Sequence, residues 1–71
     1  MSTQVLAPMP GTIVRILVSV GEKVKEDQDV AILEAMKMEN PIAASTGGTV
    51  KEIKVEPGVK VDTNQVLIVL E

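Results

Sequence analysis

Cysteine, histidine and aromatic residues are all absent from this 71-residue chain. Without Cys and His, the chain cannot form a disulfide framework, a Cys/His zinc site, a thiol nucleophile or a Ser-His-Asp relay. The carboxylates also show no paired spacing that suits acid–base catalysis. We therefore expect no catalytic residue and no metal site, and we expect that the chain is not an enzyme in its own right.

Basic residues and long apolar runs are also scarce. The chain has seven Lys and Arg residues and ten Asp and Glu residues, which gives a net charge of −3. A phosphate-facing basic patch and a base-stacking platform are therefore both missing. No stretch approaches the roughly 18 consecutive apolar residues of a membrane span, and the first ten residues lack the pattern of a signal peptide. We expect a cytoplasmic protein that binds no nucleic acid and does not insert into a membrane.

The residues that are present favour a single all-β domain over residues 1–71. Hydrophobic residues make up 45% of the chain and charged residues 24%, which is enough apolar surface for one core. Val, Ile and Thr together account for 23 of the 71 residues. These β-branched side chains suit a pleated, half-buried surface better than a helix.

An internal repeat organises the chain. Residues 7–34 align with residues 44–71 without a gap, and 11 of the 28 aligned positions are identical. Two copies are too few for a solenoid, which needs three or more repeats to bury a continuous core. The repeat therefore predicts two halves that face each other across an approximate two-fold axis.

Each half predicts the same series of strands and the same irregularity. The apolar alternation changes parity between Ile13 and Ile16, and again between Val50 and Ile53. A parity change at the same place in both halves indicates a β-bulge or a sharp bend. Gly in the second central position of a turn indicates a positive φ angle there. Such turns are expected at 20–21 and 57–58, between strands at 11–18, 23–24, 30–34, 48–55, 60–61 and 66–71.

The segment that joins the halves, Ala35–Ala43 (AMKMENPIA), has no counterpart in the aligned repeat. A feature that exists once per molecule must lie where the symmetry fails. A hairpin from residues 30–34 into residues 42–44 places Lys37 at or near its tip. Non-Gly residues in so tight a turn can require a positive φ angle, which is more frequent at functional sites. Lys37 is therefore the candidate functional residue.

The residues around Lys37 carry a resemblance to a known family. Residues 34–39, Glu-Ala-Met-Lys-Met-Glu, resemble the biotin-attachment motif of biotin carboxyl carrier proteins, in the biotinyl/lipoyl attachment family. Residues 7–12 (APMPGT), 20–24 (VGEKV) and 47–50 (GGTV) are also similar to this family. The resemblance implies a flattened barrel-sandwich of two four-stranded antiparallel sheets with pseudo-two-fold symmetry. It also implies that the joining segment 35–43 is a protruding attachment hairpin.

The same resemblance implies a function. The lysine between the two methionines is the biotinylated residue in the family, so biotin is the expected cofactor, attached covalently to Lys37. A biotin protein ligase would be one partner. The domain would then shuttle carboxybiotin between the active sites of a biotin carboxylase or decarboxylase and a carboxyltransferase. It would be a non-catalytic carrier part of a multi-component carboxylase, transcarboxylase or decarboxylase.

The neighbours of Lys37 have more than one interpretation. Met36 and Met38 are expected to flank the lysine for recognition, but Met also fills irregular gaps in cores, so core packing stays open. Ala35 and Glu34 complete the motif. Glu34 matches Glu71 in the repeat, which favours a structural or solvated role over a functional one.

Two other classes of function remain open. A lipoyl carrier domain shares the fold, but its attachment lysine typically follows Asp and precedes Ala, and that context is absent here. An unmodified β-barrel interaction module is the other alternative. In such a module Lys37 would have no special role.

Overall fold

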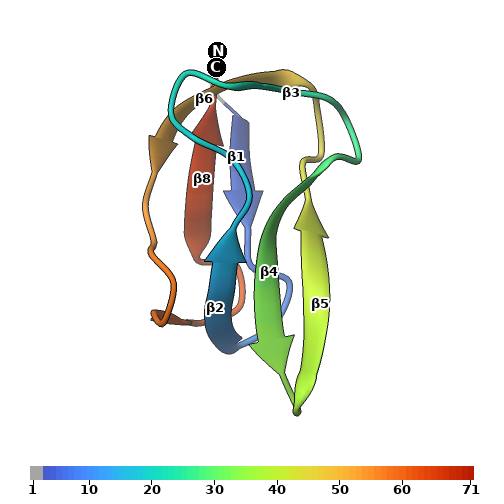
Figure 1. The fold of residues 1–71 in the computed structure, drawn as a ribbon, viewed down its shortest axis with the longest axis vertical. Coiled ribbons are helices and arrows are strands. Elements are labelled where there is room, and N and C mark those ends of the chain that lie inside the picture. Colours follow the sequence, from blue (N-terminus) through green and yellow to red (C-terminus); the bar gives the residue numbers. More distant parts are fainter. Residues whose placement is uncertain (1–2) are drawn as a thin grey trace.

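The computed structural model describes residues 3–71, which form two four-stranded antiparallel sheets (Figure 1). One sheet has the strand order β1-β8-β6-β3 and the other has the order β5-β4-β2-β7. The strands are β1 (Thr3–Leu6), β2 (Gly11–Ile16), β3 (Lys23–Val24), β4 (Asp29–Ala35), β5 (Met38–Ala43), β6 (Gly48–Ile53), β7 (Lys60–Val61) and β8 (Val66–Leu70). The predicted all-β class and the two four-stranded sheets are confirmed. No helix in residues 3–71 is long and apolar enough to cross a membrane.

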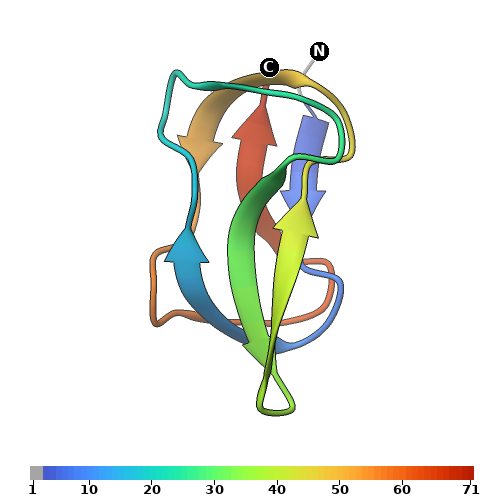
Figure 2. The same ribbon diagram turned by 45° about the vertical axis from the view of Figure 1, so that its right-hand side comes forward.

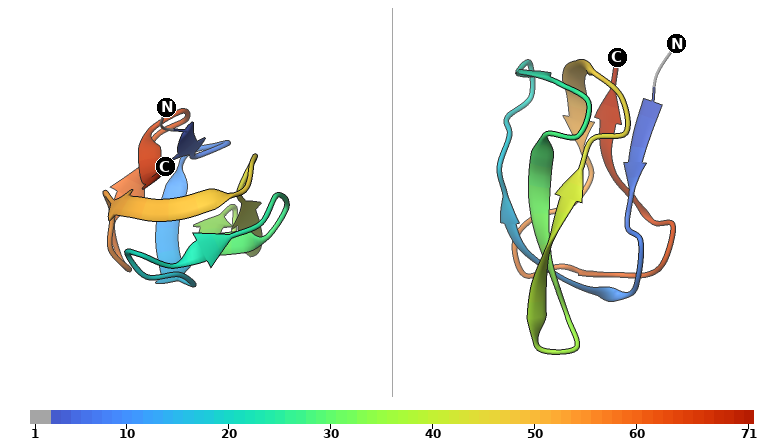
Figure 3. Two further views of the ribbon diagram at one scale, coloured as in Figure 1. Left: turned by 90° about the horizontal axis from the view of Figure 1, so that it is seen from above. Right: turned by 90° about the vertical axis from the view of Figure 1, so that its right-hand side faces the viewer.

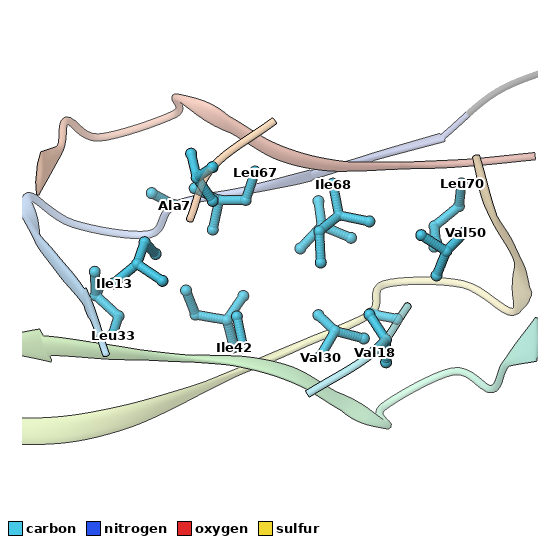
Figure 4. Close-up of a cluster of buried hydrophobic side chains, with 14 of the residues drawn as sticks. Ala7, Ile13, Val18, Val30, Leu33, Ile42, Val50, Leu67, Ile68 and Leu70 are labelled. Atoms are coloured by element: carbon cyan, nitrogen blue, oxygen red, sulfur yellow. The ribbon is translucent and has the colours of Figure 1, made fainter. Parts of the chain in front are cut away.

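The two sheets enclose one apolar core. Figure 4 shows aliphatic side chains from the two sheets pointing toward one another across this core. Its largest fully buried members are Ile13, Leu33, Leu67, Ile68, Leu70, Val30 and Val50. Within residues 3–71 no polar or charged residue is buried, so the interior is held by close packing of branched aliphatic groups.

The two halves repeat each other in local detail. The register shifts between Ile13 and Arg15 where β2 pairs with β4, and between Val50 and Glu52 where β6 pairs with β8. These shifts confirm a bulge at the same place in each half. The identical glutamines of the repeat also make identical bonds: Gln28 Oε1 and Gln65 Oε1 each accept from a backbone N–H three residues earlier, at 3.0 Å.

The predicted glycine turns are also present. Gly21 has a φ of 92° and Gly58 a φ of 93°. In each turn the residue after the glycine donates its backbone N–H to the carbonyl three residues earlier, Glu22 to Ser19 at 3.0 Å and Val59 to Glu56 at 3.1 Å. A positive φ at the third residue of a four-residue turn is the type II requirement that glycine meets without strain.

Strand ends differ from the sequence-based expectation. β2 ends at Ile16 and β6 at Ile53, two residues earlier than predicted in each half. The chain leaves its sheet at these points to cross to the other sheet, where β3 and β7 lie. Val18 and Val55 remain buried in the crossing segments, which explains the apolar pattern that suggested longer strands.

The joining segment is less unusual than the sequence comparison suggested. β1 pairs with β8 in the register that β5 has with β4, since the pair Thr3 and Leu70 corresponds to the pair Asn40 and Leu33. The statement that residues 35–43 have no counterpart is therefore wrong for residues 40–43, which correspond to residues 3–6. A four-residue strand lying outside the aligned segments gave no signal in the sequence alignment.

The β4–β5 hairpin extends beyond the body of the molecule. In Figures 1 and 2 its tip lies at one end of the long axis, and the start of β1 and the C-terminus lie at the other. Figure 3 shows the same separation from the side, with β1 and β8 in the opposite layer. The principal extents are 33 × 17 × 17 Å, so the fold is elongated along the direction in which the hairpin points.

Candidate functional site

The tip of the β4–β5 hairpin is a two-residue turn made by Met36 and Lys37. The flanking residues Ala35 and Met38 are paired in the sheet register. Met36 has a φ of 54° and Lys37 a φ of 64°. Positive φ at both central residues is the signature of the type I′ turn, whose twist matches that of the strands it joins. The predicted place of Lys37 at the tip and the predicted positive φ are both confirmed.

The turn is formed by residues that do not favour it. Type I′ turns prefer Asn-Gly, and a left-handed conformation costs an ordinary residue about 1–2 kcal/mol. The pairing of β4 with β5, from Asp29 and Ala43 to the tip, offsets this cost. Leu33 and Ile42 anchor the two strands in the core. The strands therefore impose the conformation of Lys37.

The two methionines lie outside the core. Met36 is 93% exposed and Met38 65% exposed, and Lys37 between them is exposed as well. The core-packing interpretation of Met36 and Met38 is thus excluded. Ala35, by contrast, is buried at the end of β4. The buried part of the hairpin therefore ends immediately before the tip.

Glu34 has a structural role through its backbone. It pairs with Thr12 of β2, and a Cβ atom on Gly11 would collide with the Glu34 carbonyl oxygen. The side chain itself is exposed and stands opposite Glu39 across the hairpin. Directly opposed like charges destabilise a sheet slightly. The base of the hairpin therefore depends on glycine at position 11, which lets β2 approach the end of β4 closely.

Asn40 supports the tip and was not among the predicted site residues. It is half-buried, and its Nδ2 donates a hydrogen bond to the carbonyl oxygen of Met38 at 3.3 Å. Asn is unfavourable in strands, and this is the signal that could have singled it out. The bond holds the first residue of β5 next to the turn.

The tip presents a primary amine to the surroundings. Lys37 makes no ion pair with any of residues 3–71. Across that range there is also no pocket and no group of three or more carboxylates placed to hold a metal ion. A lysine amine on a flexible four-carbon stem is a nucleophile when deprotonated. What the tip offers chemically is an exposed amine that can accept an acyl group once it is deprotonated.

The exposed position of the methionines leads to a stability prediction. Met36→Ala and Met38→Ala should each change the free energy of unfolding by less than about 0.5 kcal/mol, the usual range for a surface substitution. Leu33→Ala is the matched control, because it truncates a fully buried residue of the same hairpin. It should cost about 2–5 kcal/mol. Urea denaturation measures all three, and a loss of several kcal/mol for either methionine variant would contradict the exposed tip.

Comparison with known proteins agrees with this geometry. The family model described as Biotin-requiring enzyme (Biotin_lipoyl) matches residues 3–70. The biotin carboxyl carrier protein of Streptococcus mutans is 53% identical over 64 residues, which cover 90% of this chain and 49% of that protein. The mitochondrial propionyl-CoA carboxylase alpha chain of Homo sapiens is 39% identical over 70 residues, covering 99% of this chain and 10% of that one.

A solved structure shows the same fold. The crystal structure of the Kluyveromyces lactis urea carboxylase superposes with a TM-score of 0.94 and 25% sequence identity, over 100% of this chain and 6% of that chain. This chain thus spans about half the length of the carrier protein it matches and a small part of the carboxylases. The match of the family model over nearly all residues, together with the 53% identity, shows that the chain belongs to the Biotin-requiring enzyme (Biotin_lipoyl) family.

Proposed function

We propose that this chain is a biotinyl domain, a biotin carboxyl carrier that is covalently biotinylated on the Nζ atom of Lys37. The observation that carries the proposal is the position of Lys37, exposed at the tip of the protruding hairpin and flanked by two exposed methionines. The identity to a biotin carboxyl carrier protein supports it. Residues 1–71 then form one biotinyl domain, with residues 35–43 as its attachment hairpin.

The chemistry of attachment needs only the amine from this chain. The deprotonated Nζ of Lys37 attacks the carbonyl carbon of a biotin carboxyl group that a biotin protein ligase has activated as an acyl-adenylate. An amide bond forms, AMP leaves and the proton passes to solvent. When bound, biotin supplies a ureido nitrogen that accepts a carboxyl group in one active site and gives it up in another.

The other residues of the motif position the amine. The paired strands fix the direction of the Lys37 stem, and Met36 and Met38 present an apolar, flexible surface on either side of it. Glu34 pairs with Thr12 and so holds the base of the hairpin against β2, and Ala35 is the last buried residue before the turn. The lysine thereby lies at the end of the molecule opposite to the start of β1 and the C-terminus.

We also propose the partners and the division of labour. The carrier acts between a biotin carboxylase or decarboxylase and a carboxyltransferase, and it catalyses neither step itself. Covalent attachment raises the effective concentration of the biotin in both active sites, because each encounter becomes intramolecular within the assembly. The corresponding regions of the matched carboxylases are 6–10% of much longer chains, which supports a carrier part within a larger assembly.

Intact-mass measurement tests the proposal. The protein is co-expressed with a biotin protein ligase and weighed, and we expect an increase by one biotinyl group in every molecule. A mass increase by one lipoyl group after co-expression with a lipoyl ligase, with no biotinyl adduct, would instead support a lipoyl carrier. An unchanged mass in both experiments would leave an unmodified interaction module as the better description.

A further inference from the structure

Methionine is the only readily oxidised side chain in this protein. The sequence has four methionines and no cysteine, histidine, tryptophan or tyrosine. A peroxide that reaches the protein therefore finds no thiol and no electron-rich ring, and the thioether sulfur is its target. Two of the four methionines, Met36 and Met38, are the direct neighbours of Lys37. Half of the oxidisable sulfur of this chain thus lies at the candidate site.

The two methionines of the tip are also the most exposed ones in residues 3–71. Met36 is 93% exposed and Met38 is 65% exposed, whereas Met9, the remaining methionine of that range, is 37% exposed. Met9 also stands between two prolines, in the loop that connects β1 with β2. Oxidation requires contact between the sulfur and the oxidant. We therefore expect reactivity toward a peroxide to decrease in the order Met36, Met38, Met9.

Oxidation at the tip leaves the fold intact. Neither methionine belongs to the core, and the last buried residue before the turn is Ala35. The hydrogen bond that Asn40 donates to Met38 ends on the backbone carbonyl oxygen, so a change at the sulfur does not remove it. The turn itself is imposed by the pairing of β4 with β5. A sulfoxide therefore changes the chemistry of the tip and not its shape.

We propose that Met36 and Met38 are sites of reversible oxidation by peroxides, and that their sulfoxides switch off the attachment of biotin to Lys37. A lone pair of the thioether sulfur attacks one oxygen of hydrogen peroxide, the O–O bond breaks and an S–O bond forms. The second oxygen leaves as hydroxide, takes the proton of the transferred oxygen and becomes water. The sulfur is oxidised by two electrons and the peroxide is reduced. The effect on attachment rests on the proposed carrier function.

A sulfoxide reverses the property through which the two methionines act in that function. The thioethers give the amine an apolar, flexible surface on both sides. A sulfoxide is polar and chiral, and its oxygen needs a hydrogen-bond partner wherever a contact excludes water. A ligase surface that fits the thioethers therefore binds the oxidised tip less well. The amine of Lys37 is not altered, so reduction of the sulfoxides restores the site.

Peptide mapping tests the modification site without any ligase. The protein is treated with a limiting amount of hydrogen peroxide before biotin is attached, because biotin carries a thioether of its own. Trypsin cleaves on the C-terminal side of Lys37, so it releases Met36 and Met38 in separate peptides. We expect each of these peptides to gain one oxygen before Met9 does, as located by fragment spectra. Oxidation of Met9 ahead of both would overturn the site.

The rate of biotin attachment at limiting ligase tests the switch. Peroxide is removed before the ligase is added, and the rate is divided by that of the same protein before oxidation. We expect this ratio to fall at least about tenfold for the native chain, because a sulfoxide oxygen without a partner weakens an apolar contact. Methionine sulfoxide reductases should restore the rate. The midpoint of urea denaturation should stay unchanged, which separates the switch from unfolding.

Leucine variants separate the tip from the third methionine. The double variant Met36→Leu, Met38→Leu keeps apolar side chains beside the lysine but has no sulfur there. Its rate before and after peroxide should therefore be equal, whatever its rate is relative to the native chain. Met9→Leu is the matched control, because it removes a sulfur and leaves both tip sulfurs in place. It should lose rate on oxidation as the native chain does.

The outcomes distinguish the switch from the carrier function. Sulfoxides at both positions with an unchanged rate of attachment overturn the switch, while the carrier function stands. A loss of rate on oxidation of Met36→Leu, Met38→Leu that equals the native loss places the effect elsewhere and overturns the switch as well. A native, unoxidised protein that the ligase does not modify refutes the proposed function and the switch with it. Peptide mapping then still decides whether the tip is the site of oxidation.

Discussion

Replacing Lys37 by arginine is expected to abolish biotinylation completely and to leave the fold unchanged. The guanidinium stays protonated at every pH that a protein tolerates and offers no nucleophilic nitrogen to an activated acyl group. Position 37 lies in an exposed turn, so the change in stability should stay within about 0.5 kcal/mol. Intact mass and streptavidin capture after co-expression with a biotin protein ligase measure the adduct, and urea denaturation measures the fold.

Lys60→Arg is the matched control for this prediction. Lys60 is also exposed and lies on the same sheet, at its edge in β7. The remaining lysines are exposed too, namely Lys23, Lys25, Lys51 and Lys54. Exposure therefore does not distinguish Lys37 from the others, whereas its place at the tip does. Streptavidin capture of the Lys37→Arg protein, or a loss of capture for Lys60→Arg, would show that the attachment residue has been misidentified.

Much of the fold could be predicted from the sequence of the internal repeat. A parity change at Ile13–Ile16 and again at Val50–Ile53 predicted a bulge or a sharp bend in each half, and the register shifts show that both are bulges. Gly21 and Gly58 predicted the two type II turns for a similarly local reason. These features can be predicted from the sequence because each depends on a few neighbouring residues.

Features that depend on pairing between residues far apart in the sequence were harder to predict. β1 gave no signal, since its four residues lie outside the aligned halves and are stabilised by pairing with β8 at the other end of the chain. Val18 looked like part of a strand, yet it is buried because the chain crosses between sheets there. Hydrophobicity alone does not separate a strand from a buried crossing segment.

The candidate site was predictable in identity but only partly in conformation. The motif around Lys37 and the break in the repeat both selected that residue. The methionines could have been core residues, and only the register of β4 with β5 shows that they lie beyond the last buried residue, Ala35. The hydrogen bond from Asn40 to Met38 likewise depends on that register. Local preference argues against Met and Lys in a type I′ turn, so the paired strands decide its shape.

Moving the lysine by one position should reduce biotinylation strongly although the composition of the hairpin stays the same. The first variant combines Lys37→Met with Met38→Lys, and the second combines Met36→Lys with Lys37→Met. Residue 38 is the first residue of β5, paired with Ala35, so its side chain stands on the core side of the hairpin. Residue 36 is the first turn residue and is 93% exposed in the native protein. Both shifted lysines would be accessible to solvent but would leave the backbone in another direction.

The rate of attachment at limiting ligase measures the effect of this change in direction. Misplacing a reacting atom by about 1 Å can cost on the order of 100-fold in rate, so we expect a loss of about that size for both shifted variants. Met36→Ala, which keeps Lys37 in place, measures the part of the loss that comes from a missing methionine, and we expect its loss in rate to be smaller than that of the shifted variants. Rates equal to the native value for the shifted proteins would mean that the ligase requires only an exposed lysine between apolar neighbours. In that event the strained turn imposed by β4 and β5 would have no part in recognition, and its cost in stability would need another explanation.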